Sequence, residues 1–465
     1  LKGVAAPIRC YVVRHPSGMG PRLTHTVRRT PLVGRELEVG LCLDRWEIVQ
    51  DGAGQAVMLS GDAGIGKSRL LHVLRERLAD TPHTWIECHG SSYTMNTAFQ
   101  PVTELLQQVV GFRATDTDEV KLERLRKGLQ ITGVVSGDTL PLLASLLSVP
   151  LSANMKPLPP MSAERQRKET ISALVGWIHA IAASQPLVLV VEDLHLCDPS
   201  TVEFLGILIE QIDTSRVLVL FACRQEAQLP WPGRSNQTPV VLGPLRRSLV
   251  ATMITNVVSG RSLPSELVEF IIDKAGGIPL YVEEITKMVI ESEQVTLRDG
   301  RVELIGEIET LTIPTTLQDS LMARLDRRSE AKELAQLAAV IGRSFIYELI
   351  AVVADLDESE LRRQLAELVS AELFYQRGVV PSATFTFKHA LIQETAYRSL
   401  LRSARRDFHA RIARALEIEF PDLVEERPEM MAHHCEIGGL TDQAISYHRL
   451  AGEAAATRSA SRAAS

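Results

Sequence analysis

Long hydrophobic runs are missing from this sequence. No stretch approaches the roughly 20 apolar residues that a membrane-spanning helix needs, and no signal peptide opens the chain. Paired cysteines are missing too, because the six cysteines lie far apart and form no C-x-x-C motif. We therefore expect reduced, mostly buried thiols in a cytoplasmic protein without a membrane partner. The cysteines are Cys10, Cys42, Cys88, Cys197, Cys223 and Cys435.

An excess of one charge sign is also absent. The 465 residues include 50 Lys and Arg against 57 Asp and Glu, which gives a formal net charge of −7 at pH 7. This balance argues against broad, sequence-blind binding of nucleic acid, and we do not expect nucleic acid as a partner. Hydrophobic residues make up 45% of the chain, enough for buried cores, and the length predicts roughly two to four domains. Since the first residue is Leu1 rather than Met, we expect the sequence to be a piece of a longer protein.

The stretch from Gly61 to Ser68 matches the motif G-x-x-x-x-G-K-[ST] in full. The apolar segment 56–60 before it predicts a buried strand, and 69–78 after it carries leucines at helical spacing. This context favours a phosphate-binding loop over a glycine-rich turn that matches by chance. The glycines let backbone N–H groups turn inward as an anion nest, and the helix adds the positive end of its dipole. The expected nucleotide-binding residues of this loop are Gly61, Asp62, Ala63, Gly64, Ile65, Gly66, Lys67, Ser68 and Arg69.

Two residues of the loop predict what it binds. A lysine at the position of Lys67 reaches the β- and γ-phosphates, and the hydroxyl of Ser68 ligates Mg²⁺. We therefore expect ATP or ADP, together with Mg²⁺, as the cofactors.

A second chemical signal follows the apolar run 187–191, which ends in Glu192 and Asp193. A buried strand that ends in two acids can supply carboxylate oxygen to Mg²⁺ and a group that orients the attacking water. We expect one of these acids to hold Mg²⁺ with Ser68 and the other to orient water, and the residue types do not decide which does which. The alternative is an ordinary strand followed by a polar turn.

Arg224 follows another apolar run, 217–223. We expect it to sense the γ-phosphate, because a guanidinium binds phosphate oxygens in a bidentate manner. A solvated or ion-paired arginine is the alternative. The expected catalytic residues are Lys67, Glu192, Asp193 and Arg224.

The order of these motifs resembles that of the STAND class of signal-transduction ATPases. The segment 33–36 reads V-G-R-E ahead of the phosphate-binding loop, and a Gly-x-Pro step at 277–279 follows Arg224. Two departures are the Leu-Cys pair at 196–197, where relatives carry Trp-Ala, and Gln225, where proline is usual. The resemblance implies that four residues lie beside the adenine ring, namely Val33, Gly34, Arg35 and Pro279.

The same resemblance gives His389 a role. In several STAND proteins a histidine in a similar place contacts the ADP β-phosphate and locks a closed state, so we expect His389 to bind the nucleotide. The alternative is a histidine that only packs. A cluster of arginines also has two interpretations, a DNA-binding surface or a solvated helix face. Its members are Arg398, Arg402, Arg405, Arg406 and Arg411.

Changes in composition and in helical pattern divide the chain. Residues 1–14 resemble the closing strand of class III nucleotide cyclase domains, with a frayed tail as the alternative. A short strand is expected at 240–245 and a two-stranded wing at 373–377 and 384–389. The residues that carry the cyclase-like pattern are Leu1, Lys2, Gly3, Pro7, Tyr11 and Val13. The expected segments are the cyclase remnant 1–14, a linker 15–30, the ATPase core 31–239, a helical lid 240–312, a winged helix 313–420 and the start of tetratricopeptide-like repeats 421–465.

The predicted fold class is an α/β P-loop NTPase with a parallel sheet and helices on both faces. An all-α helical domain, a winged helix and the start of an α-solenoid of tetratricopeptide type are expected to follow. Residues 31–465 together resemble the ATPase and tetratricopeptide portion found behind class III adenylate cyclase domains in multidomain bacterial regulators.

That resemblance implies a nucleotide-dependent switch with slow, Mg²⁺-dependent ATP hydrolysis. The switch would regulate an attached adenylate or guanylate cyclase domain, whose own chemistry would lie upstream of Leu1. Other implied partners are a protein or small-molecule ligand of the helical repeats and further copies in a nucleotide-dependent oligomer. Two alternatives remain open, a LuxR-like ATP-dependent transcription activator and a scaffold with a static structural nucleotide.

Overall fold

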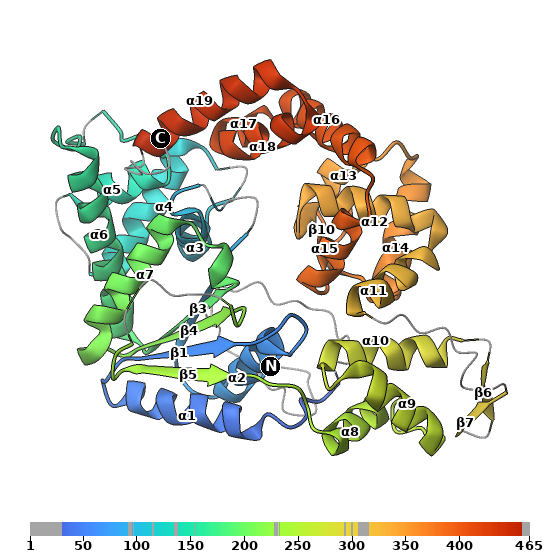
Figure 1. Ribbon diagram of the computed structural model, residues 1–465. Helices are drawn as coiled ribbons and strands as arrows, with labels where there is room; N and C mark the ends of the chain where they lie inside the picture. The colour runs from blue at the N-terminus through green and yellow to red at the C-terminus, as the bar shows by residue number, and fades with distance from the viewer. Residues whose placement is uncertain are drawn as a thin grey trace, which may run out of the picture.

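The structure of the protein is a computed structural model, shown in Figure 1. The cyclase-like segment 1–14, most of the linker that follows it and the last eight residues lie outside the described part of the chain. The described residues are 30–457 apart from 92–94, 96, 114–115, 134–137, 154, 227–230, 232, 293, 299–300 and 306–315.

A five-stranded parallel sheet carries the N-terminal half of the described chain. Its strands follow the order β2-β3-β4-β1-β5, so the strand before the phosphate-binding loop lies between β4 and β5. The central strands are buried and apolar almost throughout, as expected of a parallel sheet covered on both faces. The strands are β1 (Gln55–Ser60), β2 (Thr84–His89), β3 (Leu187–Glu192), β4 (Val217–Cys223) and β5 (Gln237–Val241).

Helices cover both faces of this sheet. Alternate residues of β3 and β4 point to opposite sides, so Val188 and Leu218 pack with one helical layer while Leu189 and Val219 pack with the other. The first layer is α1 (Glu36–Gln50) and α2 (Lys67–Leu78). The second layer is α3 (Gln100–Val110), α4 (Asp118–Ile131), α5 (Thr139–Leu146), α6 (Ala163–Ser184) and α7 (Pro199–Gln211). The predicted P-loop fold is confirmed.

A helical lid follows the sheet and lies beside it in Figure 1. The strand predicted at 240–245 begins earlier, as β5, and the predicted domain boundary after residue 239 runs through it. Pro239 is tolerated there because β5 is an edge strand that pairs only with β1. The lid consists of α8 (Arg247–Val257), α9 (Ser265–Ala275) and α10 (Pro279–Ile290), and a hairpin of β6 (Val295–Arg298) and β7 (Arg301–Leu304) follows.

The next part, here called the wing region, contains five helices and a small sheet. The predicted two-stranded wing is wrong in one respect, because the sheet has three strands in the order β8-β10-β9. Its core is aromatic: the rings of Phe374 and Phe387 lie 4.6 Å apart, and Phe345 stacks on Phe385. The elements are α11 (Leu317–Asp326), α12 (Ser329–Ile341), β8 (Ser344–Ile346), α13 (Tyr347–Val353), α14 (Glu358–Ser370), β9 (Phe374–Arg377), β10 (Thr384–Phe387) and α15 (Ala390–Arg398).

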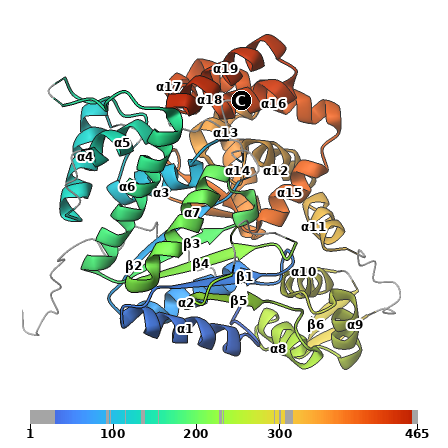
Figure 2. The ribbon, with the colours of Figure 1, turned by 60° about the vertical axis from the view of Figure 1, so that its left-hand side comes forward.

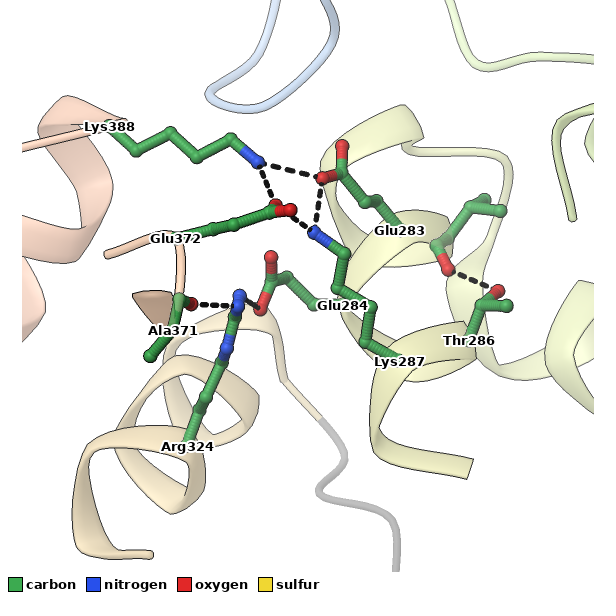
Figure 3. A network of polar contacts seen from close by, with 9 residues as sticks. Glu283, Glu284, Thr286, Lys287, Arg324, Ala371, Glu372 and Lys388 are labelled. Atoms are coloured by element: carbon green, nitrogen blue, oxygen red, sulfur yellow. Dashed lines mark hydrogen bonds and ion pairs between the residues drawn. The ribbon is translucent and has the colours of Figure 1, made fainter. Parts of the chain in front are cut away.

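A charged network joins the lid to the wing region (Figure 3). Lys388 donates to Glu283 of α10 at 2.9 Å and to Glu372 at 2.8 Å, and Lys287 bonds the same two carboxylates. Burial alone would raise the pKa of Glu283, but the two lysines hold it well below its ordinary value. This closed ring of four alternating charges fixes α10 against the end of the wing sheet.

The tail is helical and returns to the ATPase core. Figures 1 and 2 show it beside the helices that cover the second face of the sheet, and Arg427 lies 3.3 Å from Glu104 of α3. Its helices are α16 (Arg402–Glu419), α17 (Pro421–Glu426), α18 (Pro428–Gly438) and α19 (Thr441–Thr457).

The clustered arginines are mostly used inside the protein. Arg405 donates to the carbonyl of Tyr397 at 3.1 Å and lies over its ring, and Arg406 donates to the carbonyl of Gly438. The side chain of Arg411 bonds the carbonyl of Val353, and that of Arg398 pairs with Glu394. Three of the five guanidinium groups are therefore engaged with other segments and a fourth with its own helix, which favours a structural role over a DNA-binding one.

The cysteines of the described chain are buried and free, as expected. Burial raises the pKa of all five thiols, those of Cys42, Cys88, Cys197, Cys223 and Cys435. Among the described helices, none combines the length and the apolar composition that crossing a membrane requires.

A buried histidine pair holds α16 against α18. His409 lies 3.0 Å from His434 between their Nδ1 atoms and 3.1 Å from the hydroxyl of Tyr397, with Arg405 and His433 nearby. Burial lowers the pKa of His409 to about 3 and that of His434 well below its ordinary value. The folded protein therefore binds fewer protons here than the unfolded chain, whose histidines titrate near 6.5.

Acid should accordingly destabilise the protein. The contribution is fully present above pH 6.5 and is lost as pH falls toward 3, so at pH 5 His409 alone should lower the free energy of unfolding by about 2 kcal/mol. Urea denaturation at pH 7 and pH 5 measures this loss, and replacing both His409 and His434 by Gln should flatten it. If the double variant loses as much stability between pH 7 and pH 5 as the parent chain does, His409 and His434 are not the cause of the acid sensitivity.

Candidate functional site

The phosphate-binding loop has the backbone that the motif predicts. Gly64 has φ +79° and Gly66 has φ +105°, both in the left-handed region that favours glycine. A Cβ on Gly64 would lie 3.0 Å from Leu280 of α10 and 3.2 Å from Leu317 of α11. The loop is therefore packed directly against the lid and the wing region.

Lys67, the first residue of α2, lies over this loop. Its ammonium donates to the carbonyl oxygens of Gly61 at 2.7 Å and Asp62 at 3.0 Å. Burial lowers the pKa of Lys67, the negative charge of Asp193 opposes that shift, and Arg224 adds to it. The side chain is thus already placed among the groups expected at the phosphates.

The ends of β2 and β3 meet at the hydroxyl of Ser68. Ser68 donates a short hydrogen bond to Glu192, and His89 of β2 lies beside Glu192 with Nδ1 3.8 Å from Oε1. Two hard oxygen atoms at one point, from a hydroxyl and a carboxylate, are the donor set that Mg²⁺ accepts. Within the described residues, no group of three or more His, Cys, Asp or Glu side chains is arranged to hold a metal, so such an ion would need nucleotide and water oxygens as well.

Asp193 points elsewhere although it is the next residue. Its φ of +52° turns the chain sharply at the end of β3, a conformation that Asp tolerates better than most residues. Its carboxylate faces Arg343 of the wing region, with Oδ2 3.5 Å from Nη1. The structure therefore separates the two adjacent acids, with Glu192 at Ser68 and Asp193 at Arg343.

Arg224, directly after β4, is ion-paired. Its Nη2 lies 3.3 Å from Oε2 of Glu394 on α15. Arg224, expected at the γ-phosphate, and Asp193, one of the two acids expected at Mg²⁺ and the attacking water, both contact the wing region.

Three of the residues expected beside the adenine contact the lid or belong to it. Gly34 lies close to Leu249 of α8, and Val33 packs against the apolar core shared with the lid. Pro279 is the first residue of α10, and the next backbone N–H donates to the carbonyl of Gly64 at 3.2 Å. The start of α10 therefore lies against the phosphate-binding loop.

Arg35 and Arg69 have structural partners. Arg35 is buried and donates to the carbonyls of Ile65 and Gly243, so it ties the start of α1 to the loop. Arg69 donates to the carbonyl of Thr30 at 2.7 Å. A contact of either side chain with the nucleotide stays a prediction.

His389 precedes α15, and its buried Nε2 has no hydrogen-bond partner among the described residues. Its pKa is lowered to about 3, mainly by burial and also by Lys388 and Arg343, while Glu283 opposes the shift. The imidazole is therefore neutral, with a polar atom that packing alone leaves unsatisfied.

Three residues of this site were missed from the sequence. His89 could have been found, because it ends β2 opposite Glu192 and parallel strands present their carboxyl ends at one edge. Arg343 and Glu394 carry no local signal, since the chain that separates them from the ATPase core is long and their positions depend on how the wing region packs.

A family comparison agrees with the site. Residues 31–220 match the family model described as AAA ATPase domain. Among curated proteins, the chain is 28% identical over 470 residues to uncharacterized protein R02095 of Rhizobium meliloti (strain 1021), covering 99% of this chain and 44% of that protein.

Adenylate cyclase type 10 is a more distant relative. The rabbit protein (Oryctolagus cuniculus) is 21% identical over 397 residues, covering 74% of this chain and 24% of the cyclase. The human protein is 20% identical over 430 residues, covering 81% and 26%. The chain thus spans less than half of the first relative and about a quarter of the cyclases.

Among solved structures, a STAND protein with a tetratricopeptide repeat sensor from Pyrococcus horikoshii aligns with a TM-score of 0.47 at 13% identity, over 90% of this chain and 58% of that one. The ORC1 protein of Aeropyrum pernix, solved in complex with DNA, gives 0.39 at 14% identity, over 81% and 95%. Nucleotide binding follows from the family match and the intact phosphate-binding loop. Residues 31–220 therefore resemble an AAA ATPase domain, and the chain is distantly similar to the type 10 adenylate cyclases.

Proposed function

We propose that this chain is the nucleotide-dependent switch of a longer signalling protein, with ATP hydrolysis slow and used to reset it. One observation carries the proposal: the phosphate-binding loop touches the lid through Leu280 and the wing region through Leu317 at the same glycine. A nucleotide in this loop lies where three parts of the chain meet, so its phosphates can bias how those parts are arranged.

In this proposal each residue has one task. Backbone N–H groups of the loop and Lys67 bind the β- and γ-phosphates, and the guanidinium of Arg224 binds the γ-phosphate. Ser68 and Glu192 hold Mg²⁺, which neutralises charge on the β- and γ-oxygens when it is bound. Asp193 orients the attacking water. The contact between Ser68 and Glu192 and the separate orientation of Asp193 support this division of the two acids.

The output of the switch is proposed to be an attached adenylate or guanylate cyclase domain. The distant relationship to adenylate cyclase type 10 supports this class of output, as does the cyclase-like pattern in 1–14, which lies outside the described residues. We further propose the segment boundaries and the cytoplasmic location expected from the sequence. The helices α18 and α19 would begin a tetratricopeptide-type array that receives a protein or small-molecule ligand, and oligomer formation would depend on the nucleotide.

Limited proteolysis of the purified chain tests the switch. ADP and a non-hydrolysable ATP analogue with Mg²⁺ should protect different sites in the lid and the wing region, because each nucleotide favours a different arrangement. Parallel measurement of phosphate release gives the turnover of ATP. Identical protection by both nucleotides, with tight binding of each, would instead support a scaffold that holds the nucleotide statically.

His389→Ala should weaken ADP binding more than ATP binding, by about tenfold or more. The expected loss is that of a charge-assisted hydrogen bond from the imidazole to the β-phosphate, about 1.5–3 kcal/mol. Titration with fluorescent ADP and ATP measures both affinities, and His179→Ala on α6 is the control because it lies outside the site. Equal losses for both nucleotides, or none, would make His389 a packing residue.

A further inference from the structure

The wing region forms ion pairs with two residues of the ATPase site, Asp193 and Arg224. Arg343 faces the carboxylate of Asp193 at 3.5 Å, and Glu394 faces the guanidinium of Arg224 at 3.3 Å. Both partners belong to the wing region, one just before β8 and the other on α15. Arg343 is positive and meets the negative Asp193, and Glu394 is negative and meets the positive Arg224.

In the described hydrogen bonds and ion pairs, Lys67 and Ser68 make no contact with the wing region. Lys67 bonds only carbonyl oxygens of its own loop, and Ser68 bonds Glu192 within the ATPase core. In the proposed function Ser68 and Glu192 hold the metal, and Lys67 reaches the β-phosphate as well as the γ-phosphate, so these groups also act on ADP. The wing region therefore contacts Asp193 and Arg224, the two groups that the proposed function places at the γ-phosphate alone.

We propose that Arg343 and Glu394 form a clasp that holds Asp193 and Arg224 away from hydrolysis, so that the arrangement seen here binds nucleotide but does not turn it over. The inference rests on the function proposed above. Arg343 and Glu394 are positioning residues in it, since they act through Asp193 and Arg224.

The strength of the clasp suits a reversible device. About half of Arg224 and a third of Arg343 remain exposed, and ion pairs with that exposure shift an equilibrium by about one- to fivefold each. A γ-phosphate offers Arg224 a doubly charged, bidentate partner in place of one half-exposed carboxylate. ATP can therefore displace Glu394, whereas ADP, which lacks that group, leaves the pair intact.

Reciprocity gives the clasp a measurable signature. If ATP binding must break the contact of Glu394 with Arg224, then removing Glu394 must favour ATP over ADP by the same factor. Removing the charge of Arg343 breaks its ion pair with Asp193. Because Asp193 is proposed to orient the attacking water, this change is expected to alter the rate of ATP hydrolysis rather than the affinity for ATP. The two variants therefore affect different quantities.

The experiment compares Glu394→Gln, Arg343→Gln and the double variant with the parent chain. Glu394→Gln should raise the affinity for ATP relative to ADP about two- to fivefold, and Arg343→Gln should raise the rate of ATP hydrolysis by a similar factor. In the double variant, hydrolysis should rise more than in either single one. Arg362→Gln is the matched control, because Arg362 of α14 forms an exposed ion pair with Glu358 on its own helix and has no ion pair with the ATPase core among the described residues.

Repeating the Glu394 substitution in a chain that lacks Arg224 distinguishes loss of the clasp from a general loosening of the wing region. In an Arg224→Gln chain, Glu394→Gln should no longer change the preference for ATP over ADP. Folding is followed by circular dichroism and thermal unfolding in every variant. Unchanged affinities and rates in folded variants, a fall in turnover with Arg343→Gln, or the same effect of Glu394→Gln in the Arg224→Gln background would each overturn the clasp. A parent chain that binds neither nucleotide would overturn the proposed function as well, so the two failures are distinguishable.

Discussion

Replacing Glu192 by Gln and Asp193 by Asn together is expected to abolish Mg²⁺-dependent ATP hydrolysis while sparing nucleotide binding. The phosphate-binding loop is built from backbone N–H groups and Lys67, none of which the double change touches. The metal ligand and the water-orienting carboxylate act on the transition state, and loss of one preorganised group of this kind typically slows a reaction by about 100-fold or more.

Single variants should separate the two acids. Glu192→Gln should raise the Mg²⁺ concentration needed for activity, because Glu192 lies at the hydroxyl of Ser68. Asp193→Asn should leave that requirement unchanged and lower the rate. The control is Glu87→Gln, a carboxylate of β2 that pairs with Arg75 and lies outside the site. A double variant that hydrolyses ATP at the parent rate would remove both acids from the mechanism.

The parts of the site that the sequence predicts are those set by local pattern. The strand before Gly61, the helix after Lys67 and the apolar run that ends at Glu192 all follow from residue spacing within a few residues. These segments recur in the structure with bounds that differ by one or two residues. Local pattern is sufficient there because a buried parallel strand needs an apolar run wherever it lies in the sheet.

What the sequence leaves open depends on contacts between distant segments. The two acids at the end of β3 look equivalent as residue types, but the turn at Asp193 sends them to different partners. The strand β8 was missed because Ser344–Ile346 is too short to carry a period, and its place is defined only by pairing with β10. The contacts of Arg343 and Glu394 with the ATPase core follow from that packing.

Arg35 illustrates the same limit at a single residue. Its place in the V-G-R-E segment implied a position beside the adenine, whereas its guanidinium in the structure is buried against backbone carbonyls of the loop and of Gly243. A buried guanidinium needs such acceptors, and which carbonyls provide them is decided by how α1 meets β5. The motif alone does not predict these acceptors, and a place of Arg35 beside the adenine stays a prediction.

Lys67→Ala should abolish ATP binding while the fold stays intact. The ammonium of Lys67 is the cation closest to the loop in its described contacts, since the guanidinium of Arg35 donates to the carbonyl of Ile65 at 3.5 Å. The other donors expected at the phosphates are neutral backbone N–H groups. Charge-assisted hydrogen bonds contribute about 1.5–3 kcal/mol each, so losing two at the phosphates should weaken ATP at least about 100-fold. The two carbonyls that Lys67 now bonds can be solvated at the open side of the loop, so we expect only a small change in the free energy of unfolding.

Titration with fluorescent ATP, with circular dichroism alongside, measures both effects. Lys67→Met serves as a second variant, because it keeps the length of the side chain and removes only its charge. Lys168→Ala, an exposed lysine of α6 that pairs with Glu164, is the control and should bind as the parent chain does. Adenosine, which has no phosphates, should bind all of these chains equally, since Lys67 is expected to act on phosphate and the base is expected beside Val33, Gly34 and Pro279. An unchanged ATP affinity in a folded Lys67→Ala chain would therefore remove the phosphate assignment, whereas loss of adenosine as well would mean that the loop itself has collapsed.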